Sequence, residues 1–209
     1  MDYETKATNR KELRLYAKLF RSICGFSPNE CIDPILLLDK LPDLEGFENV
    51  RYEIVYGNEL PKNVPAQCTL TDDGYMIQIK DTVYMGAYEK KTGGHRMHIM
   101  HEIMHTFADK LGFKPIFSRQ LTKDVPPFRR LEWIVMALAG EVMMPYEACQ
   151  RTEGHIRRVG CRSEETHNLL KSPNERNDAL CVTIASRVAP TTLDDSKQNT
   201  IKDMLKHAT

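Results

Sequence analysis

Residues 96–105 read R-M-H-I-M-H-E-I-M-H and lie in a stretch, near 95–111, whose apolar residues recur at helical spacing. On a helix, His101 and His105 lie one turn apart on one face, so both imidazoles can reach the same ion. Glu102 lies beside them, where it can take a proton from a water molecule on that ion. The pattern H-E-x-x-H therefore predicts a helix that carries a Zn²⁺ site and the catalytic base Glu102.

A third metal ligand is needed, because a catalytic zinc usually takes three protein groups and a water molecule. Residues 110–112, shortly after the motif, are Lys, Leu and Gly and supply no ligand there. A following helix, between Pro126 and Pro145, offers Glu132 and Glu141. These are nine residues apart and so lie on nearly opposite faces, which means that only one can face the ion. Glu132 is favoured because Val135 and Ala139 lie on its face of the helix. The small residues Ala139 and Gly140 would let this helix approach the H-E-x-x-H helix closely.

Two further polar residues of the first helix are candidates for supporting roles. His98 lies on the ligand face, where it could stabilise an oxyanion or contact a ligand, although a polar surface histidine explains it equally well. Asp109 follows His105 by one turn and could accept the free N–H of a ligand histidine. The alternative for Asp109 is a solvated carboxylate at the end of the helix.

Both motif regions resemble one known family. Residues 96–105 are similar to the R-F-T-L-A-H-E-L-G-H of the ImmA/IrrE family of metallopeptidases. Residues 132–145, which read E-W-I-V-M-A-L-A-G-E-V-M-M-P, resemble that family's E-x-x-A-N-x-F-A-x-x-L-L-M-P helix without a gap. The resemblance covers roughly residues 30–147 and implies that Glu132 is the third zinc ligand. It also implies an endopeptidase that cleaves a protein substrate, often a helix-turn-helix transcriptional repressor.

The sequence departs from the family pattern at four positions. Met104 replaces the usual glycine, and Met136 replaces the usual Asn or Asp. Val135 and Leu138 stand where Ala and Phe are usual. None of these changes removes a ligand, so the departures bear on the shape of the pocket.

The remaining patterns predict an α+β fold in a single domain of residues 1–209, and the family resemblance implies that it contains a minimal zincin-like core. We expect a small, mostly antiparallel sheet beside the H-E-x-x-H helix, with further helices around it. A Thr-Asp-Asp-Gly turn at 71–74 separates two alternating stretches and indicates a hairpin. The expected strands are 52–56, 66–70, 75–79 and 82–85; the other expected helices are 9–24, 35–41, 172–188 and 194–207, the last two within a helical extension at 148–209.

Composition sets the remaining expectations. Lys+Arg and Asp+Glu balance at 29 each, so no global charge favours direct binding to nucleic acid or to a membrane surface. The first residues lack a basic-then-apolar export signal, which predicts a cytoplasmic protein with reduced cysteines. Two rival functions stay open. One is a metal-containing regulatory protein of the same fold that cleaves nothing, and the other is a DNA-binding regulator that uses the arginines near 151–162.

Overall fold

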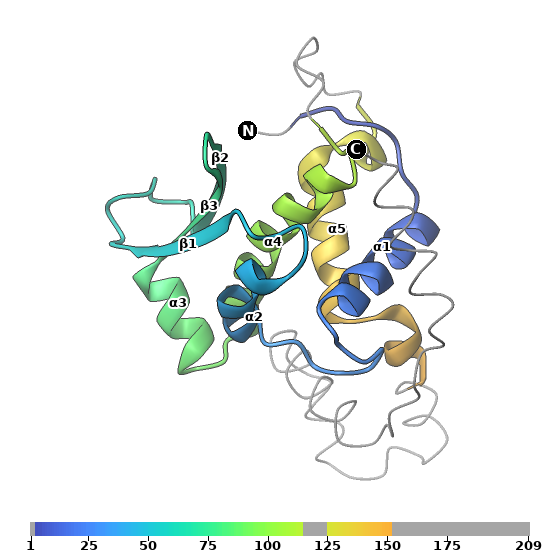
Figure 1. The fold of residues 1–209 in the computed structure, drawn as a ribbon, viewed down its shortest axis with the longest axis horizontal. Coiled ribbons are helices and arrows are strands. Elements are labelled where there is room, and N and C mark those ends of the chain that lie inside the picture. Colours follow the sequence, from blue (N-terminus) through green and yellow to red (C-terminus); the bar gives the residue numbers. More distant parts are fainter. Residues whose placement is uncertain (1–2, 115–124, 152–209) are drawn as a thin grey trace.

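The computed structural model describes residues 3–114 and 125–151 of the chain (Figure 1). The helices expected at 172–188 and 194–207 lie outside these described residues, as does nearly all of the expected 148–209 extension. Most of the arginine cluster considered for DNA binding also lies outside them.

The first two helices begin at side-chain caps that the sequence supplies. α1, Arg10–Ile23, starts after Asn9, whose side chain accepts hydrogen bonds from the backbone N–H groups of the first turn at 3.0 and 3.1 Å. α2, Pro34–Lys40, starts after Asp33, with proline at its first position. A single 3₁₀ turn, η1, follows at Leu41–Asp43. The predicted helices at 9–24 and 35–41 are therefore confirmed.

The sheet has three strands in the order β1-β3-β2. They are β1, Val50–Val55, β2, Ala66–Thr71, and β3, Gly74–Lys80. β2 and β3 form the predicted antiparallel hairpin, whereas β1 runs parallel to β3. The expectation of a mostly antiparallel sheet was therefore wrong. The connection at 56–65 places β2 one strand position away from β1, and β3 then fills the gap between them, parallel to β1 and antiparallel to β2.

The strand expected at 82–85 is instead part of a helix, α3, Asp81–Tyr88. The β-branched and aromatic residues there favour a strand locally, but tertiary packing overrides that preference. Val83 and Ala87, one helical turn apart, are both buried. Gly86 lies so close to α4 that an added Cβ would come within 1.8 Å of the His95 ring.

The hairpin turn gives a prediction for stability. Gly74 has φ +126°, and a Cβ there would lie 2.2 Å from the backbone oxygen of Asn49. Gly74→Ala should therefore lower the free energy of unfolding by about 2 kcal/mol or more, measured by urea denaturation. Gly46→Ala is the matched control, because Gly46 also has a positive φ, +86°, but open space around its Cβ position. Equal losses for the two variants would show that the close approach to Asn49 is not significant.

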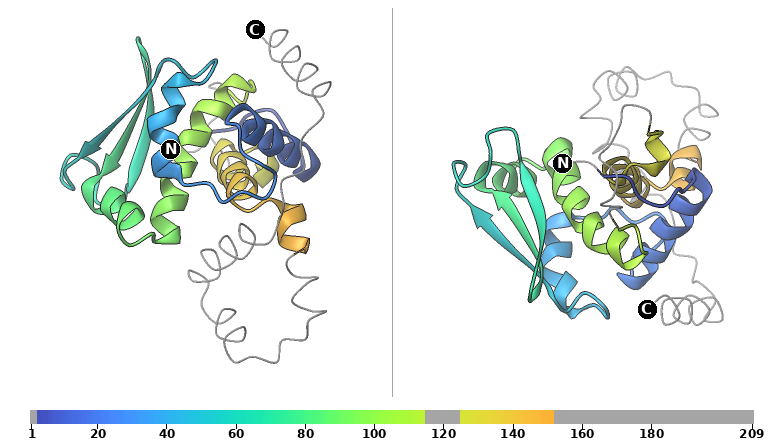
Figure 2. Two further views of the ribbon diagram at one scale, coloured as in Figure 1. Left: turned by 60° about the horizontal axis from the view of Figure 1, so that its bottom comes forward. Right: turned by 90° about the horizontal axis from the view of Figure 1, so that it is seen from above.

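α4, Gly93–Lys110, lies at the centre of the described fold. The sheet packs on one side of it, and α5, Leu131–Met143, packs on the other, with α1 beyond α5 (Figure 2). The apolar stripe predicted for this helix is buried, as shown by the 0–1% exposure of Ile99, Met100, Ile103, Met104 and Phe107. The predicted helix near 95–111 is confirmed.

The start of α5 differs from the prediction. The two prolines at 126–127 do not open the helix; they lead into a 3₁₀ turn, η2, Pro127–Arg129. α5 begins two residues later, at Leu131, so that Glu132 lies in its first turn.

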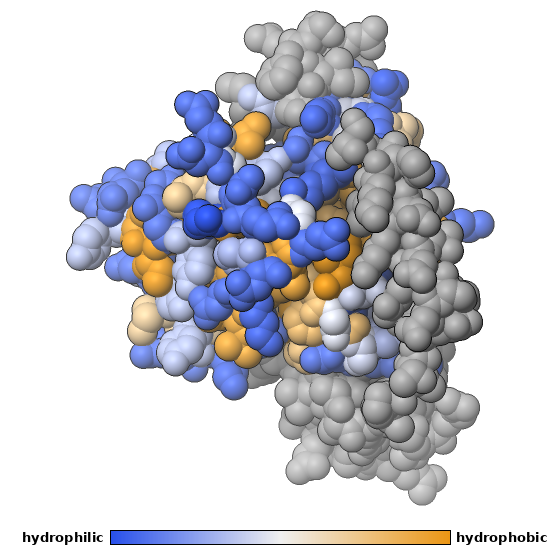
Figure 3. Space-filling view, viewed as in Figure 1, coloured by the Kyte–Doolittle hydropathy of each residue, from blue (hydrophilic) through white to orange (hydrophobic). Residues whose placement is uncertain are grey.

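The described surface is mostly hydrophilic on the face drawn in Figure 3, with apolar side chains in separate small groups. Within residues 3–114 and 125–151, no helix combines the length and the apolar character that a membrane span requires.

Candidate metal centre

Three side chains from α4 and α5 converge on one point. The Nε2 atoms of His101 and His105 lie 3.1 Å apart. Glu132 Oε2 lies 3.1 Å from Nε2 of His101 and 3.6 Å from Nε2 of His105. These residues form a group that could hold a metal ion. The structure thus brings together the three residues that the sequence predicted as ligands.

The other glutamate of α5 faces away from this cluster. Glu141 pairs with Arg14 of α1, with Nε and Oε1 3.4 Å apart. α5 is packed between α4 and α1, so its two faces meet different helices. Only Glu132 lies with the two histidines, which confirms the prediction that Glu132 and Glu141 cannot both face the same ion.

The spacing of the three donor atoms fits a tetrahedral ion. Nitrogen and oxygen ligands lie about 2.0–2.2 Å from Zn²⁺, so two such ligands at the tetrahedral angle are roughly 3.3–3.6 Å apart. The observed separations are close to that range, two at 3.1 Å just below it and one at 3.6 Å at its upper end. The donor types, two imidazoles and one carboxylate, also match a set that zinc peptidases use. The residues present therefore fit a zinc ion.

The cluster is buried on its histidine side and accessible on its glutamate side. The side chains of His101 and His105 are 11% and 21% exposed, whereas that of Glu132 is 39% exposed. Structural zinc sites are usually closed by four protein ligands, and catalytic sites keep one position open for water or substrate. Among the described residues, three side chains supply donor atoms and the glutamate edge of the group is accessible, which leaves room for a water molecule or a substrate.

Glu132 is ionised at neutral pH. Burial raises its pKa, but hydrogen bonds with His101 and His105, and their charges, outweigh this and hold the pKa well below its usual range. A carboxylate in its ionised form is the form that binds a metal.

Glu102 is held by the edge of the sheet. The backbone N–H of Cys68, on β2, donates a hydrogen bond to Glu102 Oε2 at 2.8 Å. Burial raises the pKa of the Glu102 carboxyl to about 7, although the charge of His101 and the Cys68 N–H oppose the shift. A cation held by the nearby ligands would also oppose it, because it stabilises the carboxylate. Glu102 is therefore a buried carboxyl group that can both accept and release a proton near neutral pH.

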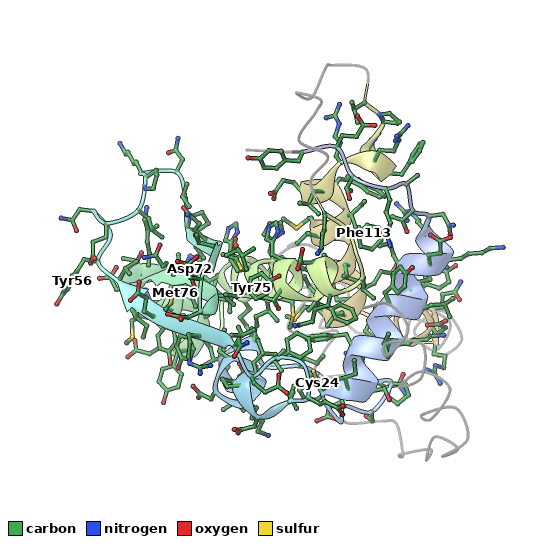
Figure 4. The ribbon with its side chains drawn as sticks, turned by 45° about the horizontal axis from the view of Figure 1, so that its top comes forward. Cys24, Tyr56, Asp72, Tyr75, Met76 and Phe113 are labelled. Carbon is green, nitrogen blue, oxygen red and sulfur yellow. The ribbon has the colours of Figure 1, made fainter. Side chains whose placement is uncertain are left out.

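The two candidates for supporting roles, His98 and Asp109, both lie on α4. Tyr75 of β3 lies beside α4 (Figure 4). Its hydroxyl donates a hydrogen bond to Asp109, which ties the end of α4 to the sheet. His98 is exposed, and its pKa is lowered by burial of part of its ring and by the neighbouring His101 and His95. The roles predicted for His98 at an oxyanion or beside a ligand stay predictions.

One buried atom of the centre lacks a partner among the described residues. Nδ1 of His101 is buried and makes no hydrogen bond there. Metal-binding histidines usually donate this second N–H to a carboxylate, a carbonyl or water, and the partner raises the basicity of the ligand. Asp109, which the sequence offered as such a partner, accepts a hydrogen bond from Tyr75, and its role beside a ligand histidine stays a prediction.

Sequence reasoning missed the two contacts that fix α4 against the sheet, from Cys68 and from Tyr75. Cys68 acts through its backbone N–H, which every residue except proline carries, so its side chain gives no signal. The hairpin itself was predictable, but its placement relative to α4 depends on packing between distant segments.

The chain matches no family model and no curated protein, and its fold matches no solved structure.

Proposed function

We propose that this protein is a zinc-dependent endopeptidase that hydrolyses a peptide bond in a protein substrate. The observation that carries the proposal is the convergence of His101, His105 and Glu132 at ligand spacing, beside the buried Glu102. By the ImmA/IrrE resemblance, we include helix-turn-helix repressors among the candidate substrates.

The four residues have two roles in the proposed reaction, metal binding and proton transfer. His101, His105 and Glu132 would hold the ion, which supplies a Lewis acid that polarises the scissile carbonyl and acidifies a water molecule. Glu102 accepts a proton as water attacks the carbonyl and delivers it to the leaving amine. The Cys68 N–H fixes one oxygen of Glu102, so that the carboxyl group keeps a single orientation through both transfers.

The proposal predicts hydrolysis that depends on the metal. We expect the purified protein to cut sites in a complex peptide library, with the products identified by mass spectrometry. Treatment with a zinc chelator should abolish the cleavage, and added zinc should restore it, because ligand residues alone provide no Lewis acid. Cleavage that survives complete removal of the metal would contradict the proposal.

A further inference from the structure

A partly buried, extended segment before α1 contacts both helices that carry the ligands. Residues 3–8, here called the strap, run in Figure 1 as the blue segment that passes over the start of α5 and leads into α1. Two residues of the strap, Glu4 and Thr5, are 4% and 0% exposed. Such burial of a polar extended segment indicates specific contacts.

The strap pairs with the residues that lead into α5. Thr5 N–H donates to the backbone oxygen of Arg129 at 2.9 Å, and Thr8 N–H donates to that of Phe128 at 3.1 Å. Leu131 N–H donates in turn to the backbone oxygen of Tyr3 at 2.9 Å. Leu131 is the first residue of α5, which has no side-chain cap, and the ligand Glu132 follows it directly. The strap therefore satisfies the first free N–H of this helix.

An ion pair and a lysine complete the contacts. The buried carboxylate of Glu4 lies 2.8 Å from the guanidinium of Arg129. Lys6 Nζ donates to the backbone oxygen of Leu111 at 2.6 Å, at the C-terminal end of α4, and lies 4.6 Å from the centre of the Phe113 ring. The strap thus joins the end of the helix that carries His101 and His105 to the start of the helix that carries Glu132.

We propose that the strap positions Glu132 for metal binding, with Glu4 as a positioning residue that acts through Arg129. The inference rests on the proposed metal centre. The first turn of an uncapped helix is held by few intrahelical hydrogen bonds. The direction of the Glu132 side chain therefore depends on the contacts that fix residues 128–131, which lead into α5. The strap supplies that support from a part of the sequence distant from both motifs.

The test measures zinc affinity by competition with a chromophoric chelator. Glu4→Ala should weaken zinc binding roughly ten-fold, the lower end of the effect of removing a group that orients a ligand. Glu4→Gln, whose amide oxygen can still accept a hydrogen bond from the Arg129 guanidinium, should fold even if Glu4→Ala does not, and should weaken binding less. Asn9→Ala is the matched control, because it removes the α1 cap just after the strap and leaves the pairing with residues 128–131 intact.

A double-mutant cycle separates positioning from a purely structural role. If the strap acts through Glu132, Glu4→Ala should have no further effect on zinc affinity in a Glu132→Ala background, although it lowers the melting temperature in both backgrounds. An equal loss of zinc affinity in both backgrounds would overturn the positioning role of Glu4. The same conclusion would follow if the wild type binds zinc and both Glu4→Ala and Glu4→Gln bind it equally well. Either result would leave the metal centre itself standing. A folded wild type that binds no zinc would overturn the metal centre, and the inference with it.

Discussion

Glu102→Gln should bind zinc as the wild type does and lose peptide hydrolysis by about 10²–10⁴-fold, the usual contribution of a general acid–base. The amide has the size of the carboxyl group and can still accept the hydrogen bond from the Cys68 N–H. It cannot take a proton from the attacking water near neutral pH. The ligands His101 and His105 are unchanged, so metal content by mass spectrometry should stay near that of the wild type.

Glu141→Gln makes the same chemical change on the far face of α5, where Glu141 pairs with Arg14 of α1. It should leave both turnover and metal content unchanged. Undiminished hydrolysis in Glu102→Gln would eliminate Glu102 as the base. A wild type that holds zinc but cleaves no peptide in the library would favour the rival, a regulatory protein of this fold that uses the metal for structure.

The metal centre was predictable from sequence because its parts lie on regular elements. His101 and His105 are one turn apart within a single helix, and helical periodicity alone places them together. Glu132 could be chosen over Glu141 for two reasons. The two glutamates lie on opposite faces of one helix, and the ImmA/IrrE motif that residues 132–145 resemble has its ligand at the position of Glu132. A site built from ligands on loops would have given no such periodic signal.

The contacts around the centre were not predictable, because they join segments that are distant in sequence through backbone groups. β1 pairs with β3 and not with its neighbour in the chain, β2, and no local pattern specifies that order. The segment at 82–85 has strand-forming residues but folds as helix against α4. The strap gives no signal in the sequence, because it pairs with residues 128–131 through backbone N–H and C=O groups, which nearly every residue carries.

The ligand role of Glu132 is tested by loss of zinc binding. Glu132→Ala should weaken zinc affinity by more than about 100-fold, because losing only a group behind a ligand already costs about 10–100-fold. Glu141→Ala removes the same side chain from the same helix on the face that meets α1, so its affinity should stay at the wild-type value. Two surviving ligands, His101 and His105, can still hold zinc weakly.

The same comparison can be made through stability, which needs no substrate. Zinc at 100 times its dissociation constant stabilises a folded protein by about 2.7 kcal/mol, and at a concentration equal to that constant by only about 0.4 kcal/mol. A zinc concentration chosen for the wild type should therefore raise the melting temperatures of the wild type and Glu141→Ala clearly, and that of Glu132→Ala hardly at all. Equal shifts in all three would mean that zinc binds elsewhere. A shift lost only in Glu141→Ala would mean that the helix presents its other face to the ion.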